Sequence, residues 1–183
     1  MRPLSGPARW GILPGLSAAG GLVAGLAFQA IARGSGGRDI ILLGGLMGLA
    51  AALAVAIAPK IWMAVLLAPP LATLGMAAST FLFFYPDEPV RALRYALLPP
   101  MQILGLLATA PNVVLHGMRL KRTAAWFPKG LGLSLAAAAA SAFTVSEIFV
   151  GTRLPELLAF FTLLNAGGAV ALEAALRRSR VVS

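Results

Sequence analysis

Six apolar segments, each close to the length that crosses a bilayer, dominate this sequence. They cover residues 10–32, 40–58, 61–85, 95–117, 130–150 and 157–176, and their only formally charged residues are Glu147 and Glu173. A helix needs roughly 20 consecutive apolar residues to span the hydrocarbon core of a membrane. The pattern therefore predicts an all-α integral membrane protein, a bundle of six transmembrane helices with short loops.

The composition excludes an ordinary soluble domain. Of the 183 residues, 59% are hydrophobic and only 11% are charged, whereas about a quarter of a soluble domain is charged. The connections between the segments are too short to hold a folded domain of their own. We therefore expect residues 1–183 to form a single polytopic membrane domain.

Several kinds of chemistry are excluded by residues that are missing. The chain has no cysteine and one histidine, so it lacks the ligands for thiolate metal sites, iron–sulfur clusters and multi-histidine centres. No phosphate-binding loop or nucleophile motif is present. We expect no metal, no cofactor and no catalytic residue, and an intramembrane enzyme is the least favoured class.

The basic residues indicate how the chain is oriented. The net charge is +9, and ten Lys and Arg residues flank the segments on the side of the chain termini, against five on the other side. Because basic loops stay in the cytoplasm, both termini are predicted to be cytoplasmic, in a bacterial inner (plasma) membrane. Anionic lipid headgroups, and not nucleic acid, are the expected partners of this charge.

The first apolar segment could be mistaken for a secretory signal. The apolar run of residues 10–32 is longer than a signal core, so we expect a membrane helix.

Two connections between the segments have features of their own. Residues 86–89 predict a short interfacial helix that ends near Leu98. Basic and aromatic residues after the fourth segment predict contact with lipid headgroups; they are Arg119, Lys121, Arg122 and Trp126.

Two proline pairs interrupt apolar segments. Pro69 and Pro70 lie eight residues into the third segment, and Pro99 and Pro100 lie near the start of the fourth. Each proline frees a backbone carbonyl that lipid cannot satisfy. Pro69 and Pro70 therefore predict a broken helix that lines a substrate or ion site, with a kink accommodated by packing as the alternative.

Polar residues form a stripe along the fourth segment. Gln102, Gly105, Thr109, Asn112 and His116 recur at spacings of three and four residues, which places them on one helix face. A shorter stripe in the sixth segment includes Thr162 and Asn165. The two stripes are predicted to meet, either as a polar path through Gln102, Thr109, Asn112 and Asn165 or as interhelical hydrogen bonds alone.

Two acidic residues and the one histidine lie within the apolar segments, and the sequence predicts a different role for each. Glu173 precedes Arg177 by four residues, which predicts an ion pair within one helix, and His116 is expected at the surface. Glu147 has no local partner and is the stronger candidate for the path, with a structural role as the alternative.

The choice between a membrane subunit and a transporter rests on the small residues, because the sequence contains no group of catalytic residues. Gly11/Gly15, Gly21/Gly25 and Gly44/Gly48 have the spacing of close helix contacts. We expect a non-enzymatic membrane subunit of a larger, transport-related complex, in contact with other membrane subunits or with itself. The alternative is a self-contained transporter of a small molecule or ion, with its polar path between the fourth and sixth helices.

Overall fold

The computed structural model describes residues 4–32, 38–121, 127–148 and 154–182 of the chain. Within these ranges the chain forms seven α-helices, one π-helical turn and no strand. The elements are η1 (Ala8–Ile12), α1 (Leu13–Ile31), α2 (Asp39–Ile57), α3 (Ile61–Phe83), α4 (Pro89–Ala96), α5 (Pro99–Lys121), α6 (Phe127–Ile148) and α7 (Leu154–Val182).

Five helical stretches are long and apolar enough to cross a membrane. They are Ala8–Ile31, Asp39–Ile57, Ile61–Phe83, Pro99–Leu120 and Leu154–Ser179. In α6 the apolar stretch among the described residues is shorter, Gly132–Ile148. The prediction of an all-helical fold with several candidate membrane spans is therefore confirmed. Among the described residues, five of the six predicted spans have the length and hydropathy to cross a membrane, and the sixth is a shorter apolar helix.

The fourth apolar segment is divided differently from the prediction. Residues 95–117 were expected to form one helix, but α4 ends at Ala96 and α5 begins at Pro99. Proline suits the first turn of a helix because its missing N–H has no partner there in any case. The expected short helix is present as α4, and its Arg91 guanidinium contacts Glu88 at 3.3 Å and covers the Tyr85 ring at 4.5 Å.

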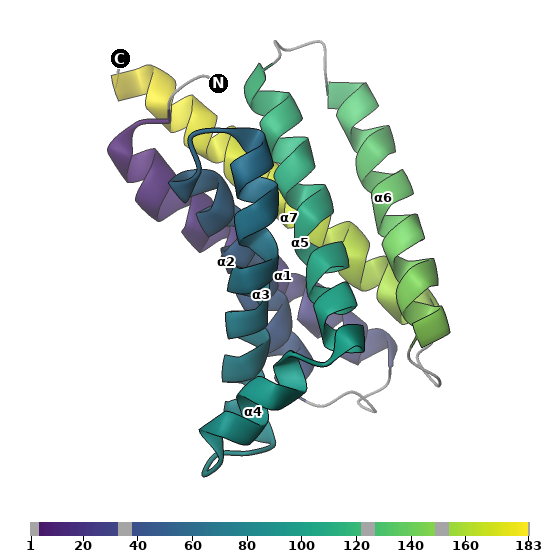
Figure 1. Cartoon of the computed structure of the whole chain (residues 1–183). Helices are drawn as coiled ribbons and strands as arrows, with labels where there is room; N and C mark the ends of the chain where they lie inside the picture. The colour runs from purple at the N-terminus through teal and green to yellow at the C-terminus, as the bar shows by residue number, and fades with distance from the viewer. Residues whose placement is uncertain (1–3, 33–37, 122–126, 149–153, 183) are drawn as a thin grey trace.

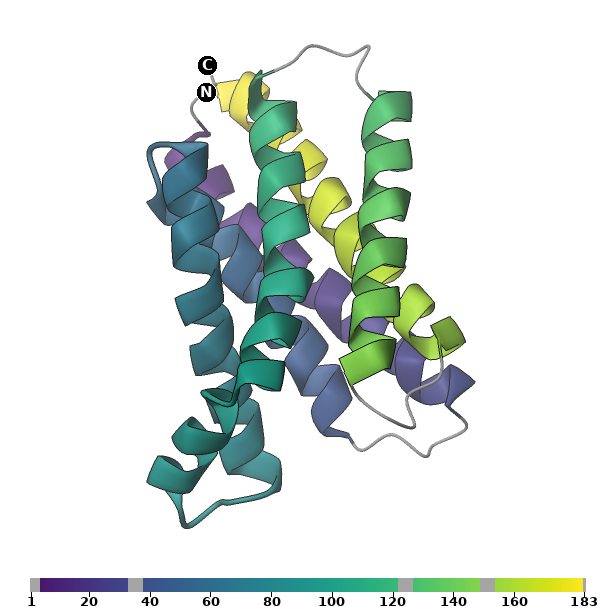
Figure 2. The same cartoon turned by 45° about the vertical axis from the view of Figure 1, so that its right-hand side comes forward.

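Both chain termini lie at one end of the bundle (Figures 1 and 2). We call this end, where α5 finishes and α6 begins, the termini end, and the opposite end the α4 end. The Ser5 N–H donates a hydrogen bond to the Ser179 Oγ at 3.0 Å. The first and last described segments are thus joined at the termini end.

Helices α1, α2 and α7 contact one another through glycine. A Cβ atom on Gly21 of α1 would lie 2.0 Å from the carbonyl oxygen of Gly44 in α2, and one on Gly48 would lie 2.1 Å from the carbonyl oxygen of Ser17. Only glycine allows backbones to approach this closely in a membrane bundle. Two of the three predicted glycine pairs, Gly21/Gly25 and Gly44/Gly48, are therefore used inside the chain, whereas Cβ atoms on Gly11 and Gly15 would meet nothing within 4 Å. The first segment packs as a helix of the bundle.

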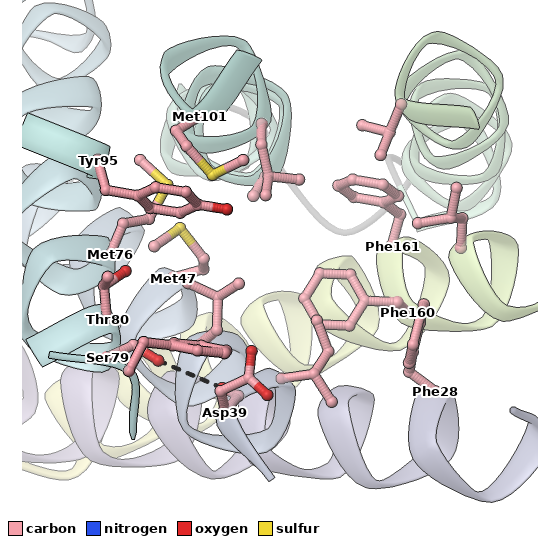
Figure 3. Close-up of a pocket in the computed structure, with 17 residues that line it drawn as sticks. Phe28, Asp39, Met47, Met76, Ser79, Thr80, Tyr95, Met101, Phe160 and Phe161 are labelled. Atoms are coloured by element: carbon pink, nitrogen blue, oxygen red, sulfur yellow. Dashed lines mark hydrogen bonds between the residues drawn. The ribbon is translucent and has the colours of Figure 1, made fainter. Parts of the chain in front are cut away.

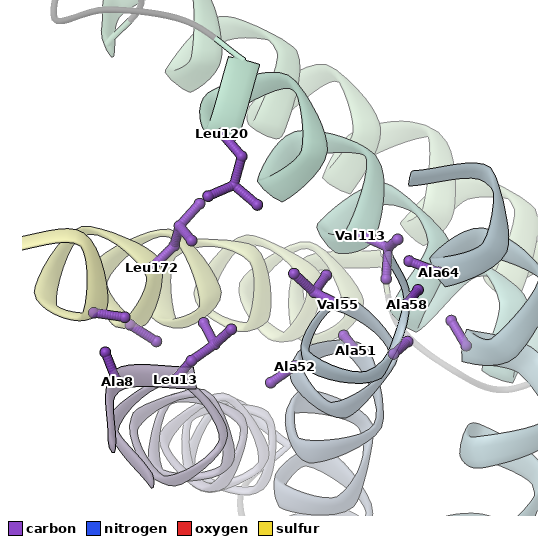
Figure 4. Packing of buried hydrophobic residues seen from close by; sticks show 14 of the residues in the cluster. Ala8, Leu13, Ala51, Ala52, Val55, Ala58, Ala64, Val113, Leu120 and Leu172 are labelled. Carbon is purple, nitrogen blue, oxygen red and sulfur yellow. The ribbon is translucent and has the colours of Figure 1, made fainter. Parts of the chain in front are cut away.

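Alanine fills most of the core beside these crossings. One buried cluster joins Ala51, Val55 and Ala64 to Val113 of α5 and Leu172 of α7 (Figure 4). Small side chains let the helix axes approach, and the resulting van der Waals contact is the main attraction between helices in lipid. This packing sets the relative positions of α5 and α7 at the termini end.

Helix α3 continues through its proline pair. Pro69 and Pro70 are both inside the helix, so the predicted break is not present. The Thr73 Oγ1 donates a hydrogen bond to the Pro69 carbonyl oxygen at 3.0 Å. The structure therefore agrees with the alternative, a helix that accommodates its prolines.

Large apolar side chains cover the outside of the bundle. On α3, Leu66 and Leu74 are more than 60% exposed, as suits a lipid-facing surface. Trp10 and Trp62 are exposed near the termini end, and Tyr95 is exposed at the α4 end. Aromatic residues of this kind mark the two interfaces of a membrane protein.

Candidate functional site

A cavity of about 490 Å³ lies between α5, α6 and α7 on the side of the termini end. It is the place where the two predicted polar stripes meet, because Asn112 of α5 and Asn165 of α7 both line it. Its volume falls in the usual range of small-molecule sites. The other polar residues of its wall are His116, Arg119, Ser134, Thr162, Glu173 and Arg177.

Two side chains of α5 hydrogen-bond to the backbone of α7. The Asn112 Nδ2 donates to the Leu164 carbonyl oxygen at 3.2 Å, and the His116 Nε2 lies 2.8 Å from the Gly168 carbonyl oxygen. His116 is only 1% exposed, so the prediction of a surface histidine is wrong. The carbonyl can only accept, so the His116 Nε2 carries a proton and donates.

The other polar side chains of the α5 stripe, Gln102 and Thr109, make their hydrogen bonds to residues outside α7. The Gln102 amide donates to the Ala96 carbonyl oxygen and its Oε1 lies 3.0 Å from the Thr73 Oγ1 of α3. The Thr109 Oγ1 donates to the carbonyl oxygen of Gly105 in its own helix at 2.7 Å. Gln102 and Thr109 line neither of the two cavities described here.

Asn165 of α7 lines the inner part of this cavity. Its side chain is 4% exposed, and it makes no hydrogen bond with any described residue. Neither amide atom is among the fully enclosed side-chain atoms that lack a hydrogen-bond partner, so the amide is accessible from the cavity. The site therefore offers a donor and an acceptor to whatever enters the cavity.

At the mouth of the cavity, Glu173 pairs with a different arginine from the one predicted. The Arg119 Nη2 lies 3.1 Å from the Glu173 Oε2, and the Arg119 Nε contacts the Glu173 Oε1. The predicted pair with Arg177 is therefore wrong: the carboxylate is engaged by a guanidinium on α5, whose planar fork suits a bidentate contact. Arg177 lines the same cavity.

The predicted lipid contacts of this region are only partly described. Arg119 is engaged by Glu173, and its side chain is 14% exposed. Lys121 ends α5, and the structure gives no description of its side chain. Arg122 and Trp126 lie outside the described residues.

A second cavity, of about 270 Å³, lies at the α4 end. Met47, Met76 and Met101 come from three helices and line it together with Phe160 and Phe161 of α7 (Figure 3). Methionine and aromatic side chains give a soft apolar wall that adapts to different shapes. Sequence reasoning missed this cavity, because no spacing along the chain shows that all seven described helices contribute to it.

Two polar groups project into the second cavity. Figure 3 shows the Tyr95 hydroxyl and the Asp39 carboxylate directed toward its interior. The Ser79 Oγ donates to the Asp39 carbonyl oxygen at 3.4 Å. Asp39 begins α2, where a carboxylate is favoured by the positive end of the helix dipole.

The remaining predicted path residues lie elsewhere. Glu147 is exposed near the end of α6, and Pro69 and Pro70 lie within α3; none of the three lines either cavity. Glu156, which the sequence places in a connection, is instead in the first turn of α7 and only 3% exposed. Among the described residues, no group of three His, Cys, Asp or Glu side chains has the geometry to hold a metal ion.

The site geometry thus consists of two cavities at opposite ends of the same three helices. Asn112, Asn165 and Arg177 are the polar side chains that set the character of the larger one. Comparisons with protein-family models, with curated proteins and with solved structures find no match to this chain.

Proposed function

We propose that the protein is a non-enzymatic membrane carrier that passes a small molecule along α5, α6 and α7. The observation that carries this proposal is the pair of cavities on these helices, one toward each end of the bundle. A carrier needs a site that can open to either side of the membrane, and cavities at both ends are the geometry from which such opening starts.

Only a thin layer separates the two cavities. On α7, Phe161 lines the cavity at the α4 end, and the next residue, Thr162, lines the other. On α5, Ala108 and Asn112 line different cavities and are one turn apart, about 6 Å along the helix axis. A side-chain movement together with a small shift of α6 would be enough to connect the two spaces.

The layer itself is polar enough to accept a passing molecule. On α5, Thr109 lies between Ala108 and Asn112, and its Oγ1 donates to the Gly105 carbonyl oxygen. The Asn112 Nδ2 donates to the Leu164 carbonyl oxygen, and the Ser141 Oγ of α6 donates to the Leu107 carbonyl oxygen at 3.3 Å. Each of these side chains bonds to a backbone carbonyl and has a further hydrogen-bonding site of its own. A substrate that forms hydrogen bonds with these side chains as it passes loses less hydration free energy without compensation.

The proposal includes the membrane topology predicted from the charges. In it α6 is the sixth crossing, the termini end faces the cytoplasm, and the protein resides in the plasma membrane of a bacterium with anionic lipids around its basic end. The support is the positive-inside rule and the position of both termini at one end of the bundle (Figure 1).

Accessibility of introduced cysteines tests the carrier proposal, and the absence of native cysteine removes the background. Ala166→Cys and Leu104→Cys each line one cavity, whereas Leu106→Cys lies on the exposed outer face of α5. We expect small impermeant thiol reagents to label the first two from opposite faces of oriented vesicles and to leave Leu106→Cys unlabelled, because a thiol in hydrocarbon does not ionise.

The decisive variant is Asn165→Cys, in the inner part of the larger cavity. A carrier that alternates between its two openings exposes this residue to both faces, so reagent added to either side will label it. Labelling from one face alone would indicate a closed binding pocket, and labelling from neither face would exclude a path here. Both of these results contradict the carrier proposal.

A second candidate function, a subunit of a larger transport-related complex, is favoured by one glycine pair. Cβ atoms on Gly11 and Gly15 would meet nothing within 4 Å, so this small-residue face is open to another helix. The mass of the detergent-solubilised protein separates the two candidates. A subunit would co-purify with other membrane proteins and lose them in a Gly11→Leu, Gly15→Leu variant, whereas a carrier would purify alone.

A further inference from the structure

The larger cavity has a positively charged mouth. Three charged side chains line it there, Arg119, Glu173 and Arg177. The bidentate contact between Arg119 and Glu173 uses both oxygens of the only carboxylate among them. Within the part of the chain that the structure describes, no carboxylate lies within 4 Å of Arg177. Arg177 is exposed, and its positive charge at the mouth has no carboxylate partner among the described residues.

The wall below the mouth is apolar. Leu115 of α5, Leu135 of α6, and Val170 and Leu172 of α7 contribute most of it. Carbon surface of this kind favours an apolar body and discriminates against small hydrophilic ions, which would lose their hydration without compensation. The charge at the mouth and the wall below it together fit an amphiphile with an anionic head.

The inner end of the cavity adds a second polar contact. Asn165 is 4% exposed, lines the cavity and has no hydrogen-bond partner among the described residues. It lies twelve residues before Arg177 on α7, which corresponds to about 18 Å along the helix. A ligand that reaches both residues must therefore be elongated, with a hydrogen-bonding group at the end opposite its charge.

We propose that the cavity binds a single-chain anionic amphiphile, with its acidic head at Arg177 and a hydroxyl or carbonyl group of its far end at Asn165. This proposal rests on the carrier function above and names the substrate class of the same site. The anion pairs with the exposed Arg177 guanidinium at the mouth, and the far group hydrogen-bonds to the Asn165 amide at the inner end.

Binding to the full chain in phosphatidylcholine nanodiscs tests this proposal. The probes are radiolabelled 12-hydroxydodecanoate, dodecanoate and dodecylammonium, and label retained by empty discs is subtracted. We expect 12-hydroxydodecanoate to bind about tenfold more tightly than dodecanoate, the effect of one buried hydrogen bond, and dodecylammonium not to bind above background. Equal affinity for the acid and the ammonium would overturn the proposal.

Two variants locate the contacts, each with a matched control. Arg177→Gln should reduce binding of both acids at least fivefold, whereas Arg178→Gln, at the exposed neighbouring position outside the cavity wall, should not. Asn165→Leu should weaken 12-hydroxydodecanoate binding until the preference over dodecanoate is lost. If both arginine variants weaken binding equally, the acids are bound by general surface charge and the proposed site is wrong.

A competition experiment tests whether the bound ligand is a free single-chain amphiphile or a phospholipid of the bilayer. Phosphatidylglycerol added to the discs should compete weakly, since its second chain does not fit a cavity of about 490 Å³. Complete competition at low content would mean that the site holds a structural phospholipid, against the proposal. Normal cysteine labelling of Asn165→Cys without any acid binding would leave the carrier function intact and remove only this substrate class.

Discussion

Gly20 of α1 and Gly167 of α7 lie backbone to backbone: a Cβ atom on either residue would stand 2.6 Å from the Cα of the other. Since no side chain fits between them, α1 sets the line along which α7 crosses the bundle. Helix α7 carries Asn165 and Arg177, so this crossing also positions one wall of the larger cavity. The glycine contact thus connects helix packing to the candidate site.

Substitution of either glycine by alanine should loosen this crossing. The added methyl group overlaps the opposite backbone, and overpacking of this kind typically costs about 1–3 kcal/mol. We expect Gly20→Ala and Gly167→Ala to lower the midpoint of thermal unfolding in mild detergent. The control is Gly132→Ala, whose Cβ would meet nothing within 4 Å; if it loses as much stability, the close contact is not the cause.

A second close approach involves the Asn112 amide. A Cβ atom on Gly168 would lie 2.2 Å from the Asn112 Oδ1, so Gly168→Ala should displace the amide and break its hydrogen bond to the Leu164 carbonyl oxygen. In the double variant with Asn112→Ala the clash disappears. The two effects on unfolding free energy should therefore be non-additive by about 1 kcal/mol or more, whereas simple additivity would show that the residues do not interact.

Because Glu173 pairs with Arg119, substitutions of these two residues should have non-additive effects on the free energy of unfolding. Their side chains are 14% and 32% exposed, so solvent screens the pair only in part. A double-variant cycle of Arg119→Gln and Glu173→Gln should give a coupling of about 1 kcal/mol. The same cycle with Arg177→Gln in place of Arg119→Gln serves as the control. A larger coupling energy in this control would mean that Glu173 pairs with Arg177 of its own helix and not with Arg119.

Phe161 is the bulkiest side chain in the layer between the two cavities. Its ring is 1% exposed and meets the Phe160 ring edge to face, with centroids 5.4 Å apart. Phe161→Ala should open a connection and increase the leak of small neutral solutes such as glycerol from proteoliposomes. Phe143→Ala, at an exposed position on α6, should not; equal leak from both variants would point to general loosening of the bundle.

The direction of insertion is testable on whole bacterial cells. Asp87 lies at the α4 end, and Arg178 lies at the termini end beside the terminus of α7. We expect Asp87→Cys to react with an impermeant maleimide on intact cells and Arg178→Cys to react only after permeabilisation. The reverse pattern would invert the topology without affecting the two cavities.

The sequence predicted the helical segments well because hydropathy depends on each segment alone. A stretch such as residues 40–58 is apolar whatever it packs against, and α2 accordingly spans Asp39–Ile57. The proposed meeting of the two stripes is also present, since Asn112 bonds to the residue before Asn165. Both inferences follow from local rules of length and periodicity.

The partners of individual polar groups could not be predicted in the same way. Glu173 has an arginine four residues later in its own helix, which made Arg177 the obvious partner, but the structure brings Arg119 of α5 to it. His116 lies near a helix end in sequence, yet α7 crosses it and buries it completely. Such contacts depend on helix crossing angles, and these arise from packing at glycine and alanine rather than from the polar residues themselves.

The uneven distribution of glycine contacts gives the bundle two parts with different mechanical properties. Helices α1, α2 and α7 interlock backbone to backbone, so they cannot slide without separating. The buried side chains described on α6 are small or medium-sized, Ala138, Ser141, Ala142 and Val145. The Ser141 Oγ bonds α6 to the Leu107 carbonyl oxygen of α5, and the described glycine of α6, Gly132, makes no close contact. We therefore expect α1, α2 and α7 to keep their relative positions, and α6 to be the helix that an entering ligand displaces.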